Sequence, residues 1–184
     1  MKIKIALLLL CCFILSGCGY YRTITGTVID AETLKPIEGA VVMAEWTTNV
    51  GSIGSSATAS YKVVEVVTDA NGKVTIEGLF SLVVHPPRLT IYKPGYVVWS
   101  SWGGFPVDIE RDFRWESQTF KLERFKPGYS YVEHESFFSS AIHSTLGGKK
   151  LIRDTFDNWE KDKFIEEMNQ RNEMRKRKER GEKQ

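Results

Sequence analysis

An alternation of apolar and polar residues runs from Thr23 to Glu123, and it restricts the fold more than any other feature of the chain. A spacing of two places alternate side chains on opposite faces of a β-strand, whereas a helix needs a spacing of three or four. Seven short segments follow this pattern, separated by turn residues: 23–30, 39–46, 61–69, 74–78, 88–96, 96–102 and 117–125. The pattern predicts a mainly β fold, a seven-stranded β-sandwich of two packed sheets.

The alternation also predicts which side chains share a face. In the second segment, one face collects Ala40, Val42, Ala44 and Trp46. In the sixth segment, Val97 and Trp99 share one face, while Val98 and Trp102 share the other. Two faces of one strand cannot be buried equally in a two-layer sandwich, so we expect at least one tryptophan to be exposed or covered by another segment.

The alternation changes phase before the last strand. Phe113 and Trp115 have odd numbers, whereas Phe120 and Leu122 have even numbers. One regular strand cannot bring both pairs to the same face, because successive side chains point in opposite directions. A bulge or break is therefore expected near Ser117.

Beyond Phe125 the apolar spacing becomes three or four, which predicts a helical C-terminal extension over 125–184. The stretch 135–146 forms one helix and ends at Gly147-Gly148, a helix stop. The stretch 151–180 forms a longer helix, whose early and late apolar residues fall on different faces. We expect its first part to dock on the sandwich and its later part to turn away or bend.

Three sequence blocks occur in a fixed order within the predicted sandwich. The first block consists of Gly26, Val28, Asp30, Thr33, Pro36, Ile37, Gly39, Ala40 and Val42. The second and third blocks consist of Thr68, Asp69, Gly72, Val74 and Ile76, then Leu89, Ile91, Gly95 and Tyr96. Together the blocks resemble those of carboxypeptidase regulatory-like domains. The resemblance implies a transthyretin-like (prealbumin-like) Greek-key β-sandwich over residues 23–124.

One connection departs from that family. The stretch NVGSIGSSATAS, residues 49–60, is longer than the usual link between the second and third strands. Long loops on a rigid sandwich often bind ligands. Because this one is rich in glycine and serine, we interpret it as a flexible connection.

The N-terminal residues have the pattern of an export signal. Met1–Lys4 contains two lysines, and Ile5–Leu15 is an apolar run, shorter than the roughly 20 residues that span a bilayer. The run ends at Leu15-Ser16-Gly17-Cys18, which resembles the bacterial lipobox. The alternative is an ordinary secreted protein that is cut elsewhere.

The lipobox resemblance implies a lipid-anchored protein. By this resemblance, residues 1–17 are a lipoprotein signal peptide, Cys18 is the lipidated first residue, and residues 18–22 form the tether. Two or more acyl chains hold a protein on a membrane stably, whereas one chain does not. Gly19, rather than aspartate, follows the cysteine, which in lipoproteins of this kind indicates the cell outer membrane.

Removal of the signal would change the chemistry available to the chain. Cys11 and Cys12 would be lost and Cys18 acylated, so no free thiol would remain for a disulfide, a nucleophile or a metal. Of the 25 basic residues, Lys2 and Lys4 would be lost, leaving 23 against 23 acidic ones. A formally neutral chain does not indicate a nucleic-acid partner.

Tests for catalytic motifs argue against an enzyme. The three histidines, His85, His134 and His143, do not have the spacing of a zinc peptidase site or the His-x-His pair of intradiol dioxygenases. The chain contains neither a Gly-x-Ser-x-Gly nucleophile motif nor a phosphate-binding loop. We therefore predict no catalytic residues, metal or cofactor.

Aromatic residues are the best candidates for recognition. Trp99, Trp102 and Trp115 occur within a short span and define a candidate recognition surface. Exposed tryptophans stack on sugar rings or anchor partner proteins. The alternative is that some fill the core or lie beneath the helical extension, and we favour the covering segment over a glycan.

The C-terminal tail is basic, with seven basic and three acidic residues from Arg171 to Gln184. Three interpretations stay open. The tail is a solvated helix end, or it contacts an anionic membrane surface or another anionic envelope polymer, or it folds onto a partner.

The sequence thus predicts a non-catalytic outer-membrane lipoprotein, exposed to the periplasm or the cell surface. Its expected role is that of a structural or protein-interaction module of the cell envelope. The expected partners are the membrane, through the lipid on Cys18, and an envelope protein. The alternatives are a carbohydrate-binding accessory lipoprotein that uses the exposed tryptophans and, third, a small hydrolase.

Overall fold

The computed structural model describes residues 23–52, 55–79, 81, 83–106, 116–142 and 150–181. These residues form the strands β1 (Ile24–Asp30), β2 (Val41–Ser52), β3 (Ser55–Val67), β4 (Lys73–Ile76), β5 (Arg88–Tyr92), β6 (Trp99–Ser100) and β7 (Gln118–Leu122). Two helices follow, α2 (Tyr131–Ala141) and α3 (Lys150–Glu179). The prediction of a mainly β fold with seven strands and a helical C-terminal extension is confirmed.

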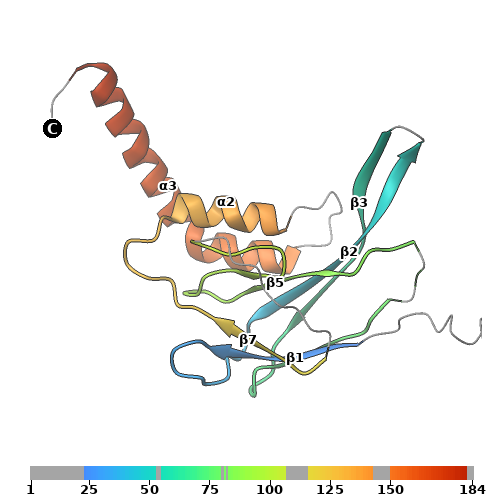
Figure 1. Ribbon diagram of the computed structural model, residues 1–184. Coiled ribbons are helices and arrows are strands. Elements are labelled where there is room, and N and C mark those ends of the chain that lie inside the picture. Colours follow the sequence, from blue (N-terminus) through green and yellow to red (C-terminus); the bar gives the residue numbers. More distant parts are fainter. Residues whose placement is uncertain are drawn as a thin grey trace, which may run out of the picture.

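The strands form two sheets (Figure 1). The three-stranded sheet has the order β4-β1-β7, in which β1 pairs antiparallel with β4 and parallel with β7. The four-stranded sheet has the order β3-β2-β5-β6 and is antiparallel throughout. Strands β7 and β6 are therefore edge strands of their respective sheets.

The space between the sheets holds the first hydrophobic cluster. It contains the predicted even-numbered face of β2, with Ala40, Val42, Ala44 and Trp46 all buried. Trp99 packs against Phe120 in an edge-to-face arrangement, with ring centroids 5.0 Å apart. A Cβ at Gly26 would lie 2.4 Å from the Phe120 ring, so this position in β1 accepts only a residue without a side chain.

The helices form a third layer on the outer face of the four-stranded sheet (Figure 1). Val41, Met43, Tyr92 and Val98 on the sheet pack against Phe138, Ile152 and Phe156 on the helices. The prediction that the first part of the long helix docks on the sandwich is confirmed. Helix α2 begins at Tyr131, earlier than predicted, because Ser130 caps it by accepting a hydrogen bond from the Glu133 N–H.

Residues 49–52 and 55–60 lie in paired strands, so the prediction that this segment is a loop was wrong. Strands β2 and β3 pair in register from Thr47↔Ser60 to Ser52↔Ser55, with a bulge at the register shift beside Trp46. Thr and Val suit a pleated strand, and the ladder that starts in the sheet continues into this segment. In Figure 1 the paired ends of β2 and β3 extend beyond the rest of the molecule.

The break predicted before the last strand lies at Ser117. This residue has a positive φ of 55°, which interrupts the extended backbone immediately before Gln118 begins β7. Its N–H donates to the Thr25 hydroxyl of β1, 3.0 Å away. Phe113 and Trp115, the odd-numbered residues from which the break was predicted, lie outside the described residues.

Candidate functional site

The structure separates the tryptophans of the predicted recognition surface. Trp99 is 5% exposed and belongs to the interior cluster between the sheets. Trp102 lies after β6 and is 70% exposed. Trp115 lies outside the described residues. Trp99 and Trp102 therefore do not form one continuous exposed surface, and Trp102 is the member that a ligand can reach.

Trp102 is held beside an arginine at the start of β5. The guanidinium carbon of Arg88 lies 3.9 Å from the centre of the Trp102 ring system, a close cation–π contact. The backbone N–H of Trp102 donates to the Ser100 hydroxyl, 3.1 Å away, which fixes the turn after β6. This pair offers an aromatic ring next to a positive charge at the surface.

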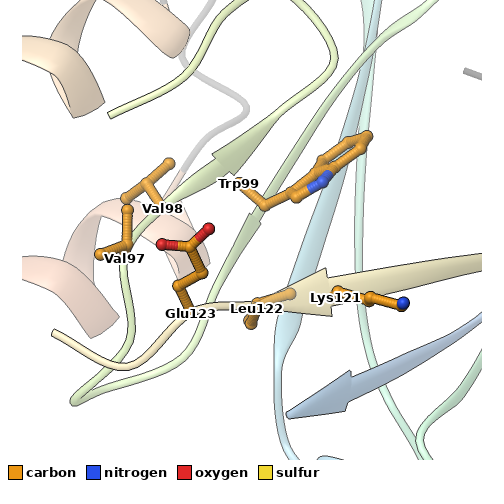
Figure 2. A pocket seen from close by; sticks show the side chains of 6 residues that line it. All are labelled: Val97, Val98, Trp99, Lys121, Leu122 and Glu123. Carbon is orange, nitrogen blue, oxygen red and sulfur yellow. The ribbon is translucent and has the colours of Figure 1, made fainter. Parts of the chain in front are cut away.

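A small hollow lies where the edges of the two sheets meet (Figure 2). Its lining consists of Val97, Val98, Trp99, Lys121, Leu122 and Glu123. The Val97 N–H donates to the Glu123 carbonyl at 2.8 Å, so the backbone joins the two segments there. With a volume of about 10 Å³, the hollow has room for one water molecule at most.

A buried polar network connects the helices to the sandwich. His134 of α2 and Glu160 of α3 are 0% and 1% exposed, and their Nδ1 and Oε2 atoms are 2.8 Å apart. The Val98 N–H donates to Nε2 of His134, so Nδ1 carries the proton and donates it to the carboxylate. The Tyr92 hydroxyl of β5 donates to Oε1 of Glu160 at 2.8 Å. Burial, together with the Glu160 carboxylate, raises the pKa of Tyr92 far above its usual value.

The sequence analysis did not predict this network. The available signal was that Glu160 falls one helical turn after Phe156, on the apolar stripe that begins at Ile152. A buried carboxylate needs hydrogen-bond donors, so a glutamate in such a stripe indicates a partner from a neighbouring element. Which residue would be that partner depends on how α2 and β5 pack, and sequence spacing does not specify that.

Two further carboxylates position the helices, one between β3 and α3 and the other between α3 and the start of α2. Glu65 of β3 accepts the backbone N–H groups of Leu151 and Ile152, at 3.0 and 2.9 Å, and so caps the start of α3. Glu167 accepts hydrogen bonds from the Ser130 hydroxyl and the Tyr131 N–H. Partial burial opposes ionisation of Glu167, but these bonds outweigh it and lower its pKa. Both helices are therefore held in a fixed orientation.

Asp30, at the end of β1, is also structural. It is 2% exposed and accepts the N–H groups of Glu32 and Thr33, the Tyr96 hydroxyl and the Arg124 guanidinium. The Thr33 N–H, with further help from these other partners, holds the Asp30 pKa far below its usual range, although burial acts in the opposite direction. The contribution of ionised Asp30 to the free energy of unfolding is complete above the ordinary aspartate pKa of about 4. It declines as the pH falls below that value.

The remaining histidines are placed apart from His134. His85 is exposed and lies 3.1 Å from the Asn49 side-chain oxygen, whereas His143 lies outside the described residues. Within the described part of the chain, no three histidine, cysteine, aspartate or glutamate residues are grouped to hold a metal ion. Glu45 is 1% exposed, and its Oε1 has no hydrogen-bond partner among the described residues.

The last part of α3 projects from the molecule. Arg171 of α3 donates to the Ser130 hydroxyl at 2.9 Å and lies 3.5 Å from the Glu133 carboxylate, both at the start of α2, and it pairs with Glu167 of its own helix at 2.8 Å. Residues 173–180 are all exposed, and Figure 1 shows this end of α3 extending away from the sheets. Among the helices that the structure describes, none is long and apolar enough to cross a membrane.

Comparisons with known proteins yield weak likenesses. No family model matches the chain, and no curated protein matches it significantly. A streptococcal ancillary pilin is similar at 18% identity and a TM-score of 0.33, over 59% of this chain and 30% of the pilin. A 3-chlorocatechol 1,2-dioxygenase from Rhodococcus opacus 1CP is similar at 16% identity and a TM-score of 0.35, over 59% of this chain and 62% of the enzyme. The chain spans less than two thirds of either protein, and neither likeness assigns it an activity.

Proposed function

We propose that this protein is a non-catalytic, lipid-anchored module of the bacterial cell envelope, held at the outer membrane through Cys18. In this proposal the sandwich is a transthyretin-like, carboxypeptidase regulatory-like domain, and its role is structural or interactive. The observation that supports an interaction role is the rigid attachment of α3. Glu160 of α3 bonds Tyr92 of the sandwich and His134 of α2, and Glu167 bonds the start of α2, while the end of α3 projects from the body.

The way in which buried ionisable groups are used supports a structural role. Asp30, His134 and Glu160 are each occupied by hydrogen bonds that join one element to another. Each of these bonds fixes a turn or the position of a helix. In this proposal, their purpose is to hold a surface in place.

Photo-crosslinking in living cells tests the interaction role. A photoreactive amino acid at Lys178 on the end of α3 is compared with one at Val50 on the β2–β3 hairpin and one at Glu77 after β4. Each of these three side chains is exposed. We expect an envelope component to be captured from Lys178 and not from Glu77. Absence of capture from all three positions would contradict an interaction role.

The lipid anchor has its own prediction. Cys18→Ser removes the thiol that the lipobox resemblance assigns to acylation. We expect complete loss of palmitate labelling, accumulation of the uncleaved precursor and loss from the outer-membrane fraction. A matched Ser16→Ala variant keeps the cysteine and should retain labelling. Normal labelling of the Cys18→Ser variant would refute the anchor without bearing on the fold.

A second candidate function is carbohydrate binding, and the exposed Trp102 favours it. Arg88 lies over the ring system and adds hydrogen-bond donors beside it. Trp102→Ala is expected to reduce affinity for a bound glycan by about thirtyfold or more, because loss of an aromatic anchor costs about 2 kcal/mol or more. The measurement is a glycan array followed by titration, with the exposed Tyr61→Ala as the control. Equal binding by Trp102→Ala and the unmodified protein would eliminate this surface as a sugar site.

A further inference from the structure

The end of α3, which we call the α3 tip and define as residues 171–181, concentrates positive charge. It contains six basic residues, Arg171, Arg175, Lys176, Arg177, Lys178 and Arg180. Against them stand two acidic residues, Glu173 and Glu179, so the tip has a formal charge of +4. Residues 1–170 contain 18 basic and 20 acidic residues, a formal charge of −2, so the positive charge is a local property of the tip.

The basic side chains surround the helix. Residues 175–178 are four consecutive basic residues, and an α-helix turns by about 100° per residue, so these four point in all directions around the axis. Met174 is the apolar residue of the tip, and it is 55% exposed. A helix that lies on a membrane needs an apolar face on one side and charges on the other. The tip does not have that arrangement.

This distribution suits a flexible partner better than a flat one. A membrane surface contacts one side of a helix, so roughly half of these charges would face away from it. A flexible polymer can follow the helix and meet charges on several sides. Binding of such a polymer releases its condensed counterions, which makes the affinity strongly salt-dependent.

The position of the tip is consistent with a partner away from the anchoring membrane. In Figure 1 the tip and the beginning of β1 lie at opposite sides of the molecule. With a lipid on Cys18, the beginning of β1 at Ile24 would lie within about 22 Å of the lipidated residue, because the chain between them has six steps of at most about 3.6 Å each. The tip lies on the far side of the domain from that point of attachment.

We propose that the α3 tip binds a flexible anionic polymer of the cell envelope that carries carboxylate or phosphate groups. This inference rests on the proposed function for the placement of the protein in the envelope. The chemistry that recognises the polymer is provided by Arg175, Arg177 and Lys178, whose side chains are exposed; Arg177 also attracts Glu173 electrostatically. Lys176 is different, since its Nζ lies 3.1 Å from Glu173.

The experiment must exclude a simpler role for the basic residues, which is stabilisation of the helix end. Positive charges in the last turn of a helix interact favourably with its macrodipole. If that is their whole purpose, replacing them weakens the helix and leaves no specific loss of polymer binding. Helicity and binding must therefore be measured on the same variants.

The experiment uses the full-length protein, purified in a non-ionic detergent. The probes are fluorescent polyphosphate, fluorescent polygalacturonate and vesicles that contain phosphatidylglycerol. The test variant is R175Q/R177Q/K178Q. The matched control is K35Q/K73Q/K121Q, which removes the same charge from exposed lysines of the sandwich. A chain that ends at Asn172 is the second variant, since it keeps the contacts of Glu167 and Arg171 with the body.

We expect the unmodified protein to bind at least one of the two polymers, with an affinity that falls steeply with salt. The test variant and the shortened chain should lose about tenfold or more in affinity, while the control changes by less than about threefold. The polymer that binds identifies phosphate or carboxylate as the recognised group. If R175Q/R177Q/K178Q loses helicity by circular dichroism, the shortened chain provides the comparison.

Three results would overturn the proposal: no binding of either polymer, equal losses in the test and control variants, or a loss of vesicle affinity in the test variant that exceeds its loss of polymer affinity, since a lipid on Cys18 would contribute equally to vesicle binding by every variant. The outcome is independent of Cys18. Polymer binding by a protein that fails lipid labelling would support the tip and contradict the envelope anchor, so the two failures are distinguishable.

Discussion

Replacing Glu160 with alanine is expected to lower the free energy of unfolding by about 3–5 kcal/mol. The change leaves the His134 Nδ1–H and the Tyr92 hydroxyl without their shared acceptor, in a region from which water is excluded. It also removes side-chain volume where α2, α3 and β5 meet. Urea unfolding of the chain produced without residues 1–18, followed by circular dichroism, measures the effect.

Two control variants show whether the stability lost in Glu160→Ala comes from the hydrogen bonds of Glu160 or from its charge. In Glu160→Gln the amide oxygen can accept from His134 while the amide nitrogen donates to the Tyr92 oxygen, so we expect a smaller loss, about 1–2 kcal/mol. Glu166→Ala removes an exposed carboxylate from the same helix and should change stability by less than about 0.5 kcal/mol. Hydrogen exchange at the Val98 amide should accelerate in Glu160→Ala. A loss below 1 kcal/mol would show that the network does not hold the helices.

The second large effect is expected between the sheets. Phe120→Ala should destabilise the protein by about 3–5 kcal/mol, because a fully buried ring is removed from the interior cluster. The same change removes the edge-to-face contact with Trp99. Unfolding in urea gives the loss, and the exposed Val83→Ala gives the baseline for removing an apolar side chain.

Gly26 provides an internal check on this prediction. Gly26→Ala alone should be destabilising, because its Cβ would meet the Phe120 ring at 2.4 Å and the Gln118 carbonyl at 2.7 Å. In the Phe120→Ala background the first clash disappears and the second remains. The two substitutions together should therefore cost less than the sum of their separate effects. Strict additivity would show that Gly26 and Phe120 do not pack as described.

The sequence predicted the strands well because their packing is local in origin. Trp46 faces the interior together with Val42 and Ala44, as a spacing of two requires. Val98 and Trp99 face opposite layers for the same reason. Strand parity also anticipated the break at Ser117. Each of these predictions depends on residues within one strand.

The features that the sequence did not reveal depend on pairings between distant segments. The composition of residues 49–60 indicated a loop, but the continued pairing of β2 with β3 makes it a hairpin. His134 and Glu160 are 26 positions apart in the sequence and lie on different helices. Their pairing requires both helices to pack on β5. Local spacing contains no information about these contacts. The alternation did place Trp99 and Trp102 on opposite faces, and Trp102 is the exposed tryptophan that it led us to expect.

The parallel pairing of β1 with β7 has a consequence for the order in which the chain can fold. Asp30 lies opposite Leu122, so the three-stranded sheet is incomplete until the residues of β7 have been synthesised. The outer face of the four-stranded sheet likewise remains uncovered until Phe156 of α3 has been synthesised. Contacts between such distant residues slow folding, and a chain that emerges from its N-terminus keeps apolar surface exposed until most of it is made. The protein therefore completes its fold only after most of the chain has been synthesised, and both the second edge of the small sheet and the cover of the large sheet form last.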